Sequence, residues 1–233
     1  MSAQTKWHTL AFRLLLAIAD LTVTGCRGSS KGTGAGEPGV MAQVNGYKVM
    51  RPELDRAFNT QTAGAPQKPS AIEEQAVRLQ VLDEIIQTRL ILQQAEKLGV
   101  KAGDDEVQTK LLDAKKAYTT EAFQKKLKDV GLTEDDYKTY LNHSITVEKV
   151  IAKEVTPRVN VSDADVNAFF DQHKAQLPPS ADEVQIKHQI REKFRGELEQ
   201  ILKAAYVEQL RNSAEIRNYY VEEVLNSHKA ETK

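Results

Sequence analysis

The sequence predicts a mainly α-helical fold with long arm helices, in which a small antiparallel β element joins the N- and C-terminal segments of one domain. Apolar residues recur at helical spacing behind a series of helix-capping signals from residue 70 to about residue 212. Strand-like stretches lie near the two ends of this region, at 40–50 and 216–221. Because a lone strand leaves its backbone groups unpaired, we expect 216–221 to pair with 42–44.

The first 25 residues have the layout of an export signal. A short segment with Lys6 precedes an apolar stretch from Leu10 to Val23, and the string VTGC occupies 23–26. This string resembles the lipobox of bacterial lipoproteins, in which the signal is cut before the cysteine, and the thiol and the new amine are acylated. The resemblance implies cleavage between Gly25 and Cys26 and makes Cys26 the lipid-bearing N-terminus.

Membrane attachment is therefore expected through lipid and not through a transmembrane helix. The apolar stretch is short and carries Arg13 and Asp20, which argues against a span. Several acyl chains on one residue anchor stably, since each buried CH2 contributes about 0.8 kcal/mol. Arg27 after the cysteine, in place of an acidic residue, favours the outer over the inner membrane by analogy with enteric sorting rules. The alternative is an ordinary buried N-terminal helix with an incidental cysteine.

The chain after the signal divides into a tether and a domain built from two segments. Residues 26–39 are rich in Gly and Ser and lack apolar periodicity, so we expect a flexible tether. Residues 40–176 and 183–221 are expected to build one domain, with a short linker at 177–182. Residues 222–233 are expected to form a tail.

The N-terminal elements of the domain are predicted by turn and capping chemistry. The dipeptide Asn45-Gly46 tolerates the positive φ angles of a type I′ turn, so Val40–Met50 is expected to form a hairpin. Pro52 suits the first position of a helix, which we expect to run through Phe58.

The later helices each begin at a cap in the sequence. Ser70 and Glu73 form a capping box that opens a long amphipathic helix ending at Gly99. Ser180 and Glu183 are expected to form a similar box before the last long helix. The other helix starts are predicted at Asp104 or Asp105, at Thr120, at Thr133 and at Ser162.

Five segments, taken in order, resemble a known family. AQVNGYKVMRPELDRAF, VLDEIIQTRLILQQAEKLGVKAGDDEV, GLTEDDYKTYLNHSITVEKVIAKEV and VNVSDADVNAFFDQH are similar to the chaperone module of the SurA and PrsA periplasmic folding factors. AAYVEQLRNSAEIRNYY is similar to the segment that returns after that family's isomerase domain. The resemblance covers about Val40 to Val221 and implies an ATP-independent chaperone that faces the periplasm.

The chain departs from the family at one point. Members commonly carry a parvulin-type prolyl isomerase domain between the two parts, yet here only the short linker 177–182 is available. The histidine pair and the Gly-Gly-Asp-Leu-like turn of parvulin sites are also missing from the sequence. We therefore expect no isomerase activity by that route and no catalytic residues.

Composition and spacing argue against several other classes of site. The formal net charge is −1 for the whole chain and about −2 without the signal, so nothing attracts nucleic acid. Gly34, Gly36 and Gly39 match a nucleotide-binding glycine pattern, but no strand precedes them. We expect no nucleotide, no other cofactor and no metal, because the sole cysteine is lipidated and the histidines are scattered. The histidines are His8, His143, His173, His188 and His228.

Partly exposed aromatic residues on helical faces are the candidate surface for unfolded or nascent exported polypeptides. Their positions on apolar helix faces favour ordinary core for most of them, and the sequence does not indicate which are left exposed. Two other functions stay open: a prolyl isomerase family member with residual activity, and an assembly or export lipoprotein with one dedicated partner. The candidate client-binding residues are Tyr118, Phe123, Tyr137, Tyr140, Phe169, Phe170, Phe194 and Tyr206.

Replacing Cys26 by serine is expected to abolish fatty-acid labelling of the chain, since the thiol is the proposed acylation site. The measurement is incorporation of a labelled fatty acid in cells that express the wild type or Cys26→Ser. A Cys26→Ser chain that still carries the label would rule out this anchor.

Overall fold

The computed structural model describes residues 37–63, 65, 67–176 and 182–231, and side chains through Asn226. The expected signal peptide, the cleavage site at Gly25 and Cys26, and most of the tether lie outside this part of the chain. Within it lie eight α-helices and a small three-stranded antiparallel sheet, which confirms the predicted fold class.

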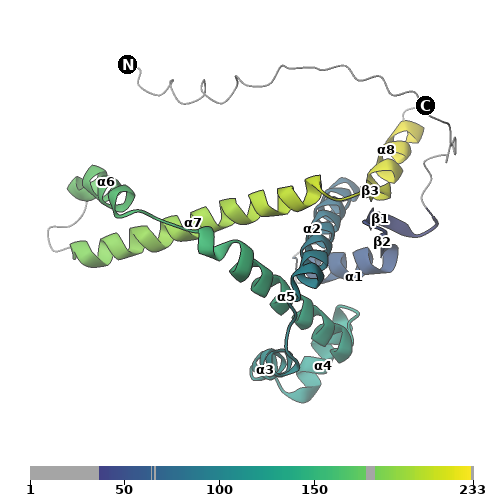
Figure 1. The fold of residues 1–233 in the computed structure, drawn as a ribbon. Helices are drawn as coiled ribbons and strands as arrows, with labels where there is room; N and C mark the ends of the chain where they lie inside the picture. Colours follow the sequence, from purple (N-terminus) through teal and green to yellow (C-terminus); the bar gives the residue numbers. More distant parts are fainter. Residues whose placement is uncertain (1–36, 64, 66, 177–181, 232–233) are drawn as a thin grey trace, which may run out of the picture. The chain divides into compact units, whose positions relative to one another are not determined.

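Figure 1 shows the order of these elements along the chain. They are β1 (Val40–Val44), β2 (Tyr47–Met50), α1 (Arg51–Thr62), α2 (Ala71–Leu98), α3 (Asp104–Lys115), α4 (Thr120–Asp129), α5 (Glu134–Glu154), η1 (Thr156–Arg158), α6 (Asp163–His173), η2 (Lys174–Gln176), α7 (Glu183–Asn212), β3 (Ile216–Asn218) and α8 (Tyr219–Glu231).

The sheet joins the two ends of the domain as predicted. Its strand order is β2-β1-β3, so β1 is the central strand and pairs antiparallel with both neighbours. Ala42 lies opposite Asn218, and Val44 lies opposite Ile216. The residues of the hairpin turn, Asn45 and Gly46, have φ angles of 48° and 86°, which are those of a type I′ turn.

Asn45 also fastens the C-terminal segment to the hairpin and to α2. Its backbone N–H donates to the carbonyl oxygen of Glu215 (2.8 Å), and its Oδ1 accepts from the N–H of Glu215 (2.8 Å). Its Nδ2 donates to Oε1 of Gln93 on α2 (2.7 Å), and Nε2 of Gln93 donates to the carbonyl of Val44 (3.1 Å). One turn residue therefore connects three parts of the chain.

The long helices extend the core in three adjoining clusters. The first packs the sheet against α1, α2 and α8 around Val44, Leu54 and Leu82. The second lies where α2, α5 and α7 meet, and the third holds α3, α4 and α5 together around Leu111. Because α2 and α7 have 28 and 30 residues, each is long enough to reach beyond one cluster.

Most helix ends follow the capping signals. The Ser70–Glu73 box is present, and Gly99 adopts a left-handed conformation with φ 64° that ends α2. Thr133 and Ser162 cap α5 and α6 as predicted, and α3 begins at Asp104. Helix α4 begins at Thr120 as predicted, with Thr119 as its cap, and α1 continues past Phe58 to Thr62.

Two sequence predictions about the C-terminal part are wrong. The strand predicted over 216–221 ends at Asn218, whose Oδ1 accepts from the N–H of Val221 (3.1 Å) and so caps α8. The helix also buries Tyr220 in the first cluster, and it occupies much of the predicted tail. The cap of α7 is Asp182, which accepts from Val184 and Gln185, so the proposed Ser180–Glu183 box does not start this helix.

No helix in the described part of the chain is long and apolar enough to cross a bilayer.

Replacing Asn45 by glycine is expected to lower the free energy of unfolding by about 1–2 kcal/mol. Glycine keeps the positive φ, so the loss reports the side-chain bonds to Glu215 and Gln93. Asn45→Asp keeps an acceptor for the Glu215 N–H and should be intermediate. Urea unfolding of the three chains measures this, and a glycine variant as stable as the wild type would contradict it.

Candidate functional site

Four of the eight candidate aromatic residues form a continuous row from the loop between α3 and α4, over α4, to α5. The ring centroids of Tyr118 and Phe123 are 6.4 Å apart, and those of Phe123 and Tyr137 are 5.8 Å apart in an edge-to-face arrangement. Tyr137 in turn stacks on Tyr140 at 6.0 Å. We call Tyr118, Phe123, Tyr137 and Tyr140 the aromatic row.

The aromatic row is anchored in the core at its middle and open at both ends. Phe123 is only 5% exposed and packs in the cluster around Leu111. Tyr137 is half-buried, whereas Tyr118 and Tyr140 are 42% and 61% exposed. Rings held in fixed positions by a buried neighbour present apolar area with little conformational freedom left to lose on binding.

Two lysines border the rings. Nζ of Lys126 lies 4.9 Å from the ring centroid of Tyr118 and donates to its hydroxyl (2.9 Å). This hydrogen bond raises the pKa of the Lys126 ammonium. Nζ of Lys115 lies 5.4 Å from the centroid of Phe123. The aromatic row therefore combines apolar faces with positive charge at one end.

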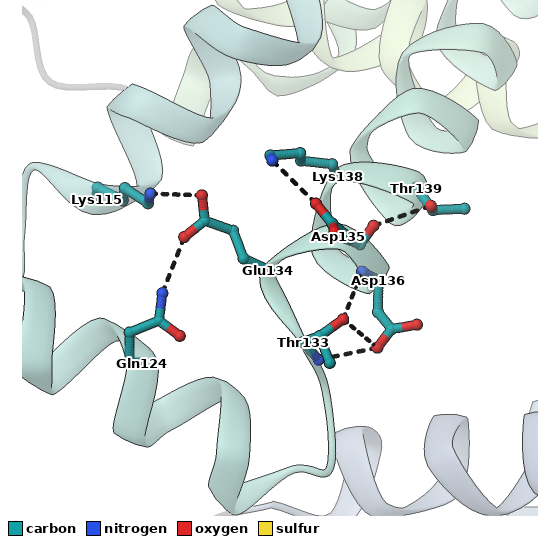
Figure 2. Close-up of polar contacts among 8 residues, drawn as sticks. All are labelled: Lys115, Gln124, Thr133, Glu134, Asp135, Asp136, Lys138 and Thr139. Atoms are coloured by element: carbon teal, nitrogen blue, oxygen red, sulfur yellow. Dashed lines mark hydrogen bonds and ion pairs between the residues drawn. The ribbon is translucent and has the colours of Figure 1, made fainter.

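Polar contacts hold the three helices in register (Figure 2). Glu134, in the first turn of α5, accepts from Lys115 of α3 (2.8 Å) and from Nε2 of Gln124 on α4 (2.9 Å). The hydrogen bond from Lys115 is the main cause of the lowered pKa of Glu134. Asp136 completes the α5 capping box, since it accepts from the Thr133 N–H (2.9 Å). The carboxylate of Glu134 thus connects both α3 and α4 to α5.

The second group of candidates packs α6 against α7. The rings of Phe169 and Phe194 meet edge to face at 5.1 Å, and Phe169 stacks on the His173 ring at 4.1 Å. Phe170 is 8% exposed, with Nζ of Lys187 4.9 Å from its ring centroid. These rings join two helices and offer less free surface than Tyr118 and Tyr140.

Tyr206 is a core residue. It is 5% exposed and lies in the cluster where α2, α5 and α7 meet. Among the described residues its buried hydroxyl has no hydrogen-bond partner, and burial raises the pKa of the phenol. The structure therefore brings four of the eight candidates into one row, of which Tyr118 and Tyr140 are exposed, and places three in a helix–helix contact. Phe123, Phe170 and Tyr206 are buried.

The same three-helix unit contains a groove that the sequence analysis missed. It lies between α3 and α5, has a volume of about 500 Å³, and is lined by residues of both helices. A smaller hollow of about 320 Å³ lies between α2 and α7. No group of three or more His, Cys, Asp or Glu residues in the described part of the chain is placed to hold a metal ion. The groove between α3 and α5 could not be predicted from the sequence, because the apolar periodicity of one helix does not show which other helix it packs against.

A helical domain in which an N-terminal hairpin pairs with a C-terminal strand has the fold of the SurA-like chaperones. One solved SurA-like chaperone of Campylobacter jejuni aligns with a TM-score of 0.51 at 14% identity, over 77% of this chain and 98% of that chain. At this identity the likeness concerns the fold.

The chain belongs to the SurA-like N-terminal domain family, which matches residues 1–151. It is 28% identical over 194 residues to a foldase protein PrsA of Clostridium botulinum, covering 75% of this chain and 57% of the relative. A foldase protein PrsA of Clostridium kluyveri is 24% identical over 201 residues, covering 77% and 59%. The chain thus spans less than two thirds of the length of these relatives, and the predicted SurA and PrsA resemblance is confirmed.

The family's isomerase domain is not inserted at the expected point. The helical turn η2 ends at Gln176 and α7 begins at Glu183, so six residues separate them. Six residues cannot form a domain.

Glu134→Gln is expected to loosen α4 at neutral pH, because it removes the charge that pairs with Lys115. The pKa of Glu134 is lower in the folded chain than in the unfolded one. Its contribution to stability is therefore fully present above the unfolded value of about 4.3 and is lost as the pH falls through the folded value. Hydrogen exchange of the α4 amides at pH 7 and near pH 3 measures the difference between wild type and variant.

The matched control is Asp135→Asn, whose carboxylate pairs with Lys138 on the same helix. This variant should leave exchange in α4 unchanged. Equal effects of the two variants at pH 7, or a Glu134→Gln effect that does not shrink as the pH falls, would contradict the connecting role of Glu134.

Proposed function

We propose that the chain is an ATP-independent chaperone that binds unfolded exported polypeptides on the aromatic row. The family assignment supports this, as do relatives named foldase and a structural neighbour among SurA-like chaperones. The observation that carries the proposal is the exposure of Tyr118 and Tyr140 at the two ends of a fixed row of rings.

The aromatic row suits weak binding of many sequences. Apolar contact is non-directional and scales with the area removed from water, so unrelated segments can share one surface. Every ring that a client covers adds a modest free energy, and release then requires no nucleotide. Lys126 beside Tyr118 keeps this end of the surface hydrated between binding events.

The proposal includes membrane anchoring. Lipid on Cys26 would hold the domain on the periplasmic side, with the outer membrane favoured over the inner by Arg27. The glycine- and serine-rich segment 26–39 would let the domain reach clients near the membrane. Support for this part comes from the sequence pattern at 23–26.

We also propose that the chain acts without isomerase activity. The six residues between η2 and α7 support this, because they leave no insert in which the family's catalytic site could lie. The candidate surface consists of rings and ammonium groups, and binding is the chemistry that such groups support.

The double variant Tyr118→Ser, Tyr140→Ser is expected to need about a thirtyfold higher concentration than the wild type to halve aggregation. Each ring removed from the contact costs on the order of 1 kcal/mol of client binding. The measurement is light scattering of an unfolded outer-membrane protein diluted from urea, with the purified chain at increasing molar ratio.

The control for this experiment is Val184→Ser, Ile201→Ser on α7, which also removes two exposed apolar side chains, 78% and 64% exposed. It should suppress aggregation as well as the wild type does, and thermal melting should confirm that both double variants are folded. A wild-type chain without suppression at stoichiometric amounts would refute the chaperone proposal. Capture of one stoichiometric partner in place of a mixture would favour the dedicated assembly lipoprotein.

The purified chain is expected to leave the cis–trans isomerisation of a proline-containing peptide at its uncatalysed rate. The uncatalysed step takes tens to hundreds of seconds at 25 °C, so acceleration is easy to detect. Exchange measured by NMR on a peptide tests this, with an authentic parvulin as positive control. Acceleration that scales with the concentration of this chain would show that it is an enzyme.

A further inference from the structure

The groove between α3 and α5 has an apolar side and fixed walls. Ala152 of α5 is exposed on the apolar side, and Ile145, which is only 5% exposed, also lines this volume of about 500 Å³. A cavity of this size accommodates a few side chains of an extended peptide.

Hydrogen bonds fix the start of α3 on α5. The backbone N–H of Ala102 donates to Oγ1 of Thr146 (3.1 Å), which is 6% exposed. Nζ of Lys149 donates to the carbonyl of Lys101 (3.2 Å). Because both bonds join the segment before α3 to α5, the groove exists before any ligand arrives, which lowers the entropy cost of binding.

The rim of the groove carries more negative than positive charge. Its carboxylates outnumber its ammonium groups by four to two. Both ammonium groups are already engaged: Lys149 pairs with Glu106, and Lys110 lies 3.7 Å from Glu148. The charged residues of the rim are Asp105, Glu106, Asp113, Glu148, Lys110 and Lys149.

The two remaining carboxylates account for the excess. Asp113 pairs with Lys116 (2.6 Å), a lysine that does not line the groove and is 76% exposed. Asp105 has no ion-pair partner among the described residues. A ligand that enters the groove thus meets an apolar wall bordered by carboxylates that its own cations can neutralise.

We propose that this groove binds an extended client segment in which an aliphatic side chain is flanked by lysine or arginine. The aliphatic group contacts Ala152 and the exposed edge of Ile145, and the flanking cations approach Asp105 and Asp113 on the rim. The inference rests on the proposed chaperone function and adds a second, charge-selective subsite to the aromatic row. The two subsites lie on the same three-helix unit and select different sequences.

Two fluorescent peptides test the proposal on the purified full chain. Both have the same leucine–valine centre, one flanked by lysines and the other by glutamates, and anisotropy gives their dissociation constants at low and high salt. The lysine peptide should bind about tenfold or more tightly at low salt, and salt should reduce the difference. Asp105→Asn, Asp113→Asn should weaken lysine-peptide binding about three- to tenfold.

The matched control is Glu192→Gln, a charge removed from the exposed surface of α7, which should bind the lysine peptide as the wild type does. A lysine peptide with serines in place of the leucine–valine centre should bind several-fold more weakly. Equal affinity for the two charged peptides, or equal losses in the groove and control variants, would overturn the proposal. So would a concentration-dependent dimer that excludes the lysine peptide, since a second copy would then be the occupant.

The aggregation assay separates this inference from the proposed function. A wild-type chain that suppresses aggregation but does not distinguish the peptides overturns the groove assignment and leaves the chaperone function standing. A chain that suppresses no aggregation refutes the function, and with it the groove as a client subsite.

Discussion

The pairing of β3 with β1 is the constraint on which the rest of the domain depends. Glu215 lies 170 residues from Asn45, yet the two exchange backbone and side-chain hydrogen bonds. Closing so long a loop costs entropy, but this cost grows only slowly with loop length. Burial in the cluster around Val44 and Leu54 offsets it. All the helices from α1 to α7 therefore belong to a single closed loop, and the long helices α2 and α7 start or end near its closure.

The unit of α3, α4 and α5 can keep rings exposed because other interactions stabilise it. Its buried cluster around Leu111 is small, and Glu134 adds polar contacts between all three helices. Phe123 belongs to both the cluster and the aromatic row, so the same packing that stabilises the unit also orients Tyr118 and Tyr137. Phe123 thus contributes both to the stability of this three-helix unit and to the position of the exposed rings. The exposed rings themselves contribute little to folding.

Local chemistry in the sequence predicted most of the fold, and long-range packing explains what it missed. The caps at Ser70, Thr133 and Ser162 act within three residues, so their sequence signals are reliable. The stretch 216–221 has aromatic and β-branched residues, but the side chain of Asn218 starts a helix there and the core buries Tyr220. Contacts between helices decide which aromatic residues meet and whether α3 and α5 enclose a groove. The periodicity of one helix does not encode contacts with another helix.

The position of β3 so late in the chain has a consequence for biosynthesis. A chain is made from its N-terminus, so β1 and β2 exist long before β3 has been synthesised. Until then β1 has an unpaired edge next to buried Val44 and Met41, which is a template for wrong pairing with other strands. A domain built this way is vulnerable while nascent, and a product truncated before Ala214 would keep that open edge permanently.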